Sequence, residues 1–377
     1  MTFLAVIALH ASAAQAGLPA IHLSQSEFAA QYGTIRAMEE AKETPEAPGL
    51  RKAVEDLAAL QHRFPSRIKT RAGQLVEAEK DGRARVDGLY WRTLDALTFS
   101  AESAEGLNRI PDIMPKVGGE LDASDAFGTI RKALDESKDE FASKLWPSER
   151  SAAQSCIDSF DEIPPAKRDA AIRFILQTAG IKKQPNSIEM LIVPRMAGPE
   201  GMTVRTMTGP LVIIGAGKYR GSDFDEVVLH EATHVFDTVA GTESLFGELR
   251  AAAQAANRSA FDVEEVPHTA MFLLAAEAIR LFVDPKHKDV GETFGIYARG
   301  LDRLCRVERP ILKDLESHRI GADEAVKRII DRRSPQFIES EAYASASSAP
   351  RRAFFIYGLS SRAGTGGWHR GATRSAT

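Results

Sequence analysis

The chain has 377 residues, 27% of them charged and 44% hydrophobic, with a formal net charge of -4. This composition is typical of a globular protein with a sizeable core, and it excludes a collagen-like or wholly disordered chain. No basic stripe points to nucleic acid as a partner, and no apolar run reaches the ~18 residues that a membrane span needs. The length is compatible with one large domain or with two of ordinary size.

The N-terminal stretch differs in character from the rest of the chain. Residues 3–9 are apolar, and Ala14-Gln15-Ala16 has the small-x-small pattern that signal peptidase reads. We therefore expect a signal peptide at residues 1–16, cleavage after Ala16, and a secreted or periplasmic protein. A short amphipathic or disordered N-terminus is the alternative, because the first three residues include no Lys or Arg.

Helical periodicity dominates residues 17–150, which we expect to form a helical N-terminal region. Apolar residues recur at spacings of three and four over residues 50–60 and 127–145, and Pro147 is expected to end the second helix. The aromatic pair Tyr90-Trp91 is expected in the core rather than in a groove, because large aromatic side chains are mostly buried.

Residues 151–343 combine short strands with longer helices. Runs of β-branched residues bounded by Pro and Gly predict strands at 188–193, 202–207 and 211–214. Helices are predicted at 170–178, 245–256, 299–317 and 322–332, and at 268–283, where Pro267 is expected to open the helix. From residue 344 the composition shifts to Ser, Ala and Gly, and we expect a disordered tail. The fold class is therefore α+β and predominantly helical.

The segment with the clearest chemical meaning is His230-Glu231-Ala232-Thr233-His234. Residues four apart on a helix lie on one face, so both imidazoles can bind a single ion while Glu231 lies beside it as general base. Ser222 and Asp225 form a capping signature before this helix, and Gly241 follows its last apolar residues. The motif predicts a site for one Zn²⁺, and the alternative is an ordinary helix with two satisfied histidines.

A catalytic zinc usually takes a third protein ligand, and no His-x-x-Gly-x-x-His continuation follows His234. We favour Glu277 as this ligand, because it lies in an almost wholly apolar helix where an unpaired carboxylate would be costly. A salt bridge to Arg280 is the alternative role for Glu277, and Glu243 and Glu248 are the alternative ligands.

Three residues are candidates for a donor to the developing oxyanion, namely His268, Tyr297 and Arg299, of which we favour His268. A surface or helix-capping role is the alternative for each. Asp237, one turn beyond His234, is a candidate partner for the outer nitrogen of a ligand histidine, and an ordinary helix-terminal Asp is the alternative. Cys156 and Cys305 are the two cysteines of the chain, and we favour two buried thiols over one disulfide.

The motif helix followed by the distant helical Glu277 resembles the gluzincin group of zinc metallopeptidases over residues 223–283. The segment is also similar to exported bacterial proteins that carry His-Glu-Ala-Thr-His. The resemblance implies a zincin-like core, in which a small sheet precedes the motif helix and an edge strand, here 202–207 or 211–214, pairs with an extended peptide.

We therefore expect a zinc-dependent peptidase acting on a peptide or protein. Two alternatives stay open, namely a catalytically inactive binding module with a zincin-like core and a zinc hydrolase of a non-peptide bond.

Overall fold

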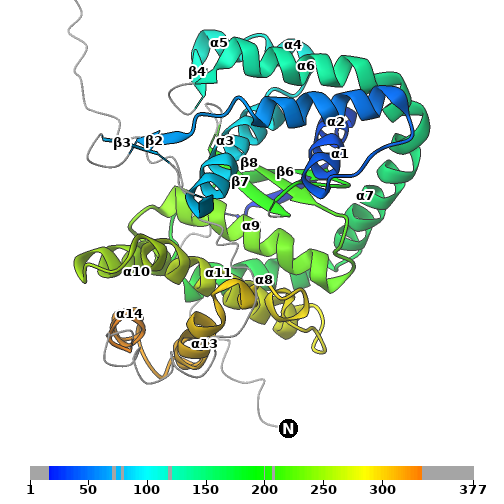
Figure 1. Cartoon of the computed structure of the whole chain (residues 1–377). Helices are drawn as coiled ribbons and strands as arrows, with labels where there is room; N and C mark the ends of the chain where they lie inside the picture. The colour runs from blue at the N-terminus through cyan, green and yellow to red at the C-terminus, as the bar shows by residue number, and fades with distance from the viewer. Residues whose placement is uncertain are drawn as a thin grey trace, which may run out of the picture.

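The computed structural model describes residues 17–69, 74–77, 80–117, 121–198, 200–205 and 209–332. These residues form a predominantly helical α+β structure with small sheets, which confirms the predicted fold class at that level (Figure 1). The predicted signal peptide at residues 1–16 and the predicted tail from residue 344 lie outside the described residues.

One mixed sheet of four strands lies at the centre of the structure. Its order is β1-β6-β8-β7, so β1 and β7 are its edges. Strand β1 (Ala20–Ser24) runs parallel to β6 (Ser187–Val193), and β6 runs parallel to β8 (Pro210–Gly215). Strand β7 (Gly201–Arg205) pairs antiparallel with β8, with Thr203 opposite Val212. Strands are thus present at the three predicted places, although residues 206 and 207 of the strand predicted at 202–207 lie outside the described residues, whereas β1 was not predicted.

Both faces of this sheet are buried, because alternate residues of a strand point to opposite faces. One face contributes to a core shared with the helices of residues 146–331, which we call the C-terminal core, through Met190, Ile192, Val212 and Ile214. The other face contributes to a core shared with the helices of residues 27–140, which we call the N-terminal core, through Val193, Met202 and Ile213.

The helices of the N-terminal region lie above the sheet in Figure 1. Helix α2 packs against α6 and α1, and the predicted helix at 50–60 is confirmed by α2. The helices of the region are α1 (Glu27–Ala41), α2 (Pro48–Gln61), α3 (Lys80–Ser100), α4 (Ala104–Leu107), α5 (Ile110–Ile113) and α6 (Ala123–Glu140). The region also contains two short antiparallel strand pairs, β2 (Arg67–Lys69) with β3 (Leu75–Glu77) and β4 (Lys116–Val117) with β5 (Leu121–Asp122). Tyr90 and Trp91 are buried in its core, as predicted.

The remaining helices flank and underlie the sheet, and α9 and α11 are the pair that matters for the site. They pack on each other, and α11 also packs on α8, α10 and α13. This layer comprises α7 (Trp146–Asp161), α8 (Pro165–Thr178), α9 (Ser222–Ala240), α10 (Leu245–Ala255), α11 (Ala260–Phe282), α12 (Val290–Thr293), η2 (Tyr297–Arg299), α13 (Asp302–Glu316) and α14 (Ala322–Asp331).

Two prolines act differently from the predictions made for them. Pro147 does not end a helical segment. A π-helical turn (η1, Phe141–Leu145) leads directly into α7, whose first turn contains the proline. A proline is tolerated there since the first N–H groups of a helix have no partner inside it. Pro267 lies inside α11 rather than at its start, because the Ser259 hydroxyl accepts a hydrogen bond from the Asp262 N–H and begins the helix earlier.

Cys156 and Cys305 are both free and buried. The Cys156 thiol lies against the backbone carbonyls of Ala216 and Tyr219, whereas Cys305 lies on α13. Burial raises the pKa of both thiols, to about 12 for Cys305. The prediction of two buried thiols is thus confirmed.

Candidate metal centre

Helix α9 carries the motif across the middle of the structure. It begins at Ser222 after Gly221 and ends before Gly241, whose N–H donates to the Asp237 carbonyl, so the predicted end is confirmed. The predicted cap at Ser222 is wrong, since its hydroxyl contacts Asp284 and His287 instead of a helix N–H. Gly221 and Gly241 have φ angles of 53° and 63°, which favour glycine at both ends.

Three histidines from two helices meet at one point. The Nε2 atoms of His230 and His234, one turn apart on α9, lie 3.2 Å from each other. His268 of α11 completes the group, in which one nitrogen from each residue lies within 4.8 Å of the other two. His230 is buried and the other two are half-buried, and the group could hold a metal ion.

The spacing and the chemistry of this group fit a metal ion. Two nitrogens bound tetrahedrally to zinc at 2.0–2.1 Å are about 3.3–3.4 Å apart, close to the observed 3.2 Å between the first two histidines. Burial lowers the pKa of both His230 and His234 well below the usual range, and the neighbouring imidazoles lower it further. Neutral imidazoles are the form that binds metals.

Neighbouring side chains fix two of the three rings. His230 stacks on Phe272, with 3.7 Å between ring centroids and an angle of 19° between the planes. His268 Nδ1 lies 3.1 Å from a carboxylate oxygen of Glu265, which is buried. A carboxylate in this position makes Nδ1 the donor and leaves Nε2 unprotonated for a metal. The spacing Glu265-x-x-His268 on an apolar helix is the sequence signal that identifies this pair.

The carboxylate of Glu231 lies against the edge strand β7. One of its oxygens accepts a hydrogen bond from Thr203 Oγ1 at 2.7 Å. A Cβ atom at Gly201 would stand 2.2 Å from the other oxygen, so glycine is required for this close approach. Burial raises the pKa of Glu231 to about 7, although the hydroxyl of Thr203 and the charges of His268 and Arg92 oppose that rise.

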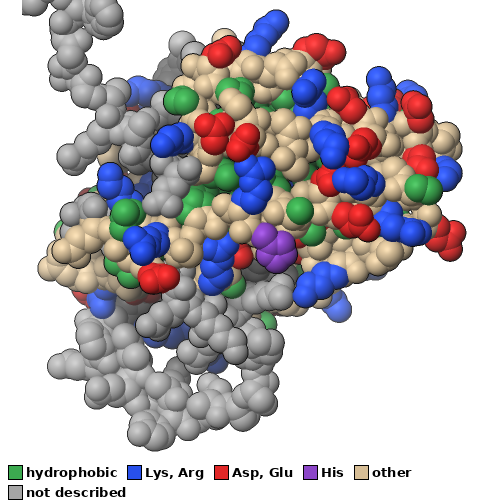
Figure 2. Space-filling view, turned by 45° about the horizontal axis from the view of Figure 1, so that its top comes forward, with side chains coloured by type: hydrophobic (Ala, Val, Ile, Leu, Met, Phe, Trp, Pro, Cys, Tyr) green, Lys and Arg blue, Asp and Glu red, His purple; other side chains and the backbone are tan. Residues whose placement is uncertain are grey.

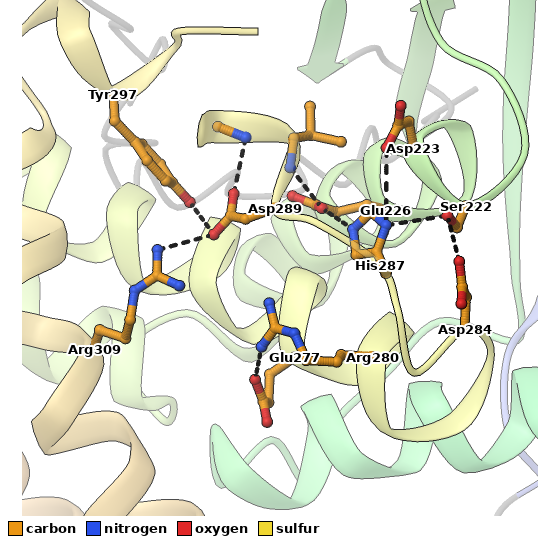
Figure 3. Close-up of polar contacts among 12 residues, drawn as sticks. Ser222, Asp223, Glu226, Glu277, Arg280, Asp284, His287, Asp289, Tyr297 and Arg309 are labelled. Carbon is orange, nitrogen blue, oxygen red and sulfur yellow. Dashed lines mark hydrogen bonds and ion pairs between the residues drawn. The ribbon is translucent and has the colours of Figure 1, made fainter. Parts of the chain in front are cut away.

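Glu277 does not join the histidines. Its carboxylate pairs with Arg280 on the next turn of α11, which was the alternative considered for it (Figure 3). Nine residues of helix separate it from His268, which corresponds to about 14 Å along the axis. The alternatives Glu243 and Glu248 are exposed, and Glu243 pairs with Lys183. Among the described residues, His268, which the sequence suggested as an oxyanion donor, is the residue that lies with His230 and His234 in the group that could hold a metal ion.

The other suggested site residues have different partners. Tyr297 donates its hydroxyl to Asp289 at 3.0 Å (Figure 3). Asp237 accepts hydrogen bonds from Ser244 and Arg250 and thereby joins α9 to α10. The side chain of Arg299 lies outside the described part of the chain.

A buried network anchors the first turns of α9 to the segment that follows α11 (Figure 3). His287 Nε2 contacts the Glu226 carboxylate, and its Nδ1 lies 3.1 Å from the Ser222 hydroxyl. The Val290 N–H also donates to Glu226, at 2.9 Å. Since Glu226 lies one turn before His230, this network fixes the helix that presents two of the three histidines.

Comparisons with family models, curated proteins and solved structures yield no match to this chain. In the described part of the chain, no helix has the length and apolar character that crossing a membrane requires. Figure 2 shows Lys, Arg, Asp and Glu side chains interspersed over one face of the molecule.

Proposed function

We propose that this protein is a zinc-dependent peptidase in which His230, His234 and His268 hold the ion. The observation that carries the proposal is the convergence of three nitrogens from two helices, with Glu231 next to His230 on α9. Three protein ligands are the number found in catalytic zinc sites, whereas structural sites use four. A bound Zn²⁺ supplies Lewis acidity, which lowers the pKa of water and polarises a carbonyl group.

Glu231 is the general base in this proposal. It follows His230 directly on α9, and burial raises the pKa of its carboxylate, which makes it a stronger base. It takes a proton from the attacking water and delivers it to the leaving amine. The hydrogen bond from Thr203 holds the carboxylate in place without supplying a charge.

The edge strand supports a peptide as the substrate. Strand β7 is an edge of the sheet, and its residues Gly201 and Thr203 contact Glu231. An extended peptide that pairs with this edge by backbone hydrogen bonds brings its carbonyl groups alongside the base. This arrangement favours a peptide over the non-peptide substrates considered above.

The test separates metal binding from catalysis. We expect one zinc per chain in the parent protein, measured by elemental analysis, and less than a tenth of that in His230→Ala. Glu231→Gln should retain zinc but hydrolyse a peptide library at least 100-fold more slowly, because it cannot accept the proton. Glu248→Gln, an exposed change on α10, is the matched control and should behave as the parent.

Two outcomes would contradict the proposal. Equal hydrolysis by the parent and by Glu231→Gln would exclude this carboxylate as the base. Stoichiometric zinc without hydrolysis of any library peptide would instead favour the binding module, with the metal in a structural role.

A further inference from the structure

Phe272 contacts the rings of two histidines that come from different helices. Its ring stacks on that of His230 from α9, with 3.7 Å between the centroids and 19° between the planes. Its centroid also lies 4.9 Å from that of His268, which is one turn earlier on α11. Only 8% of Phe272 is exposed, so these contacts are made inside the C-terminal core. One side chain thus joins the two helices that converge on the metal centre.

The ring of His230 is not held by a carboxylate in the way that Glu265 holds the ring of His268. Within the described residues, Nδ1 of His230 is buried and has no hydrogen-bond partner. A histidine that binds a metal commonly donates its outer nitrogen to a carboxylate, a carbonyl or a water, and this contact sets the direction of the ring. For His230, whose Nε2 lies towards His234, the stack on Phe272 can set that direction instead.

The ring of Phe272 is itself supported by a second aromatic ring. It meets the ring of Tyr297 edge to face, with 6.1 Å between the centroids and 88° between the planes. The Tyr297 hydroxyl donates to Asp289 at 3.0 Å (Figure 3). Gly291 approaches the Tyr297 ring so closely that a Cβ atom there would clash with it. Because Tyr297 is fixed at its hydroxyl and along its ring, it opposes any rotation of Phe272 away from His230.

We propose that Phe272 is a positioning residue, which holds the imidazoles of His230 and His268 in the arrangement of the metal site before an ion binds. This inference rests on the proposed zinc-dependent function and adds a residue that acts through the ligands. Imidazoles that rotate freely lose that freedom when they bind an ion, and the loss weakens the affinity. A ring packed on both of them removes much of this cost in advance.

The first measurement needs no metal. Histidine rings labelled with ¹³C and ¹⁵N are observed by NMR in the metal-free, full-length protein, and the signals missing in His230→Gln are those of His230. Protons that lie over the face of an aromatic ring are shifted upfield. We therefore expect upfield ring protons for His230 in the parent and a return towards ordinary positions in Phe272→Leu. Signals of His230 that are the same in both proteins would overturn the proposal.

The second measurement is the zinc affinity, obtained by competition with a chromogenic chelator. Phe272→Leu keeps all three histidines but loses the ring, so it should still bind one zinc per chain, about 10-fold more weakly than the parent. Phe246→Leu is the matched control, because Phe246 is fully buried in the same core on α10. It should be less stable to urea but bind zinc within threefold of the parent.

The outcomes separate this proposal from the function on which it rests. Equal zinc affinity in the parent and in Phe272→Leu, or an equal loss in Phe246→Leu, would overturn the positioning role. A parent that binds no zinc would contradict the proposed function instead, and the NMR comparison would still decide whether Phe272 sets the direction of the His230 ring.

Discussion

His268 receives its orientation from a residue on its own helix. Glu265, three residues earlier, holds Nδ1, and this contact sets which nitrogen can face the other two histidines. His230 and His234 need no such help to lie together, since a single helical turn brings them to one face. The third position therefore depends on how α11 packs on α9, and on Glu265 for the direction of the ring.

The choice between His268 and Glu277 as third ligand gives the first residue-scale prediction. His268→Ala should weaken zinc binding by at least 100-fold, measured by competition with a chromogenic chelator, because two nitrogens remain where three had converged. Glu277→Gln, on the same helix, should leave zinc affinity within threefold, since this carboxylate is paired with Arg280. The reverse result would restore Glu277 as the ligand and remove His268 from the centre.

Sequence alone left two partners open for Glu277, a metal ion and Arg280, and the reason is physical. A carboxylate in an apolar helix needs a compensating partner, and that reasoning about Glu277 was sound. Both a metal ion and an arginine one turn away satisfy the need, and the structure has the arginine. That His230 and His234 lie together could be predicted because their geometry is local. The contacts of Glu231 with Gly201 and Thr203 could not, because they depend on sheet pairing and on packing of α9 on β7.

Helix α9 has two adjacent buried carboxyl groups near its N-terminus. Asp225 and Glu226 are both buried, and burial raises the pKa of each to about 7. His287 opposes the rise for both, whereas Asp223 increases it for Asp225. Within the described residues, Oδ1 of Asp225 has no hydrogen-bond partner. This end of the helix is thus stabilised when its acids are protonated.

Asp225 leads to a prediction about stability and pH. Its folded pKa of about 7 exceeds the unfolded value near 4, so the folded state holds the proton more tightly. The stability that this proton provides is full below pH 4 and is lost as the pH rises to 7. Asp225→Asn removes the titration. Its free energy of unfolding relative to the parent should therefore rise by about 2.5 kcal/mol between pH 5 and pH 8.

Urea unfolding at the two pH values measures this difference, and subtracting the parent cancels the other titrating groups. Asp169→Asn, an exposed change on α8, is the control and should show no such dependence. A difference between Asp225→Asn and the parent that stays constant from pH 5 to pH 8 would contradict the buried, protonated state of Asp225.

The elements themselves were largely predictable, and the exceptions share a cause. Helices α2 and α10 and strands β6 and β8 match the predicted ranges because their apolar spacing is regular over most of their length. Strand β1 was missed, since it is short and its partner β6 lies more than 160 residues away in the sequence. The start of α11 was misplaced because Pro267 was given more weight than the Ser259 cap.

At the scale of the whole molecule, the central sheet separates two cores and belongs to both. Strand β8 shows this most directly, since Ile213 is buried in the N-terminal core and the next residue, Ile214, in the C-terminal core. The predicted division at residues 150 and 151 stays a prediction. Because both cores share this sheet, we expect the regions on either side of it to unfold together.

The two isoleucines of β8 form a matched pair that tests this coupling. Both are fully buried, so Ile213→Ala and Ile214→Ala should each lower the free energy of unfolding by about 2–4 kcal/mol. If the sheet joins the two cores, each variant should show one cooperative transition by circular dichroism and calorimetry, shifted to lower temperature. Zinc should raise the midpoint temperature of that single transition in both variants, since a ligand that binds the folded state stabilises every part that unfolds with its site. Two separate thermal transitions would instead show that the two cores fold independently. In that case each substitution would lower the temperature of only one transition. Zinc would raise the temperature of only the transition that Ile214→Ala affects.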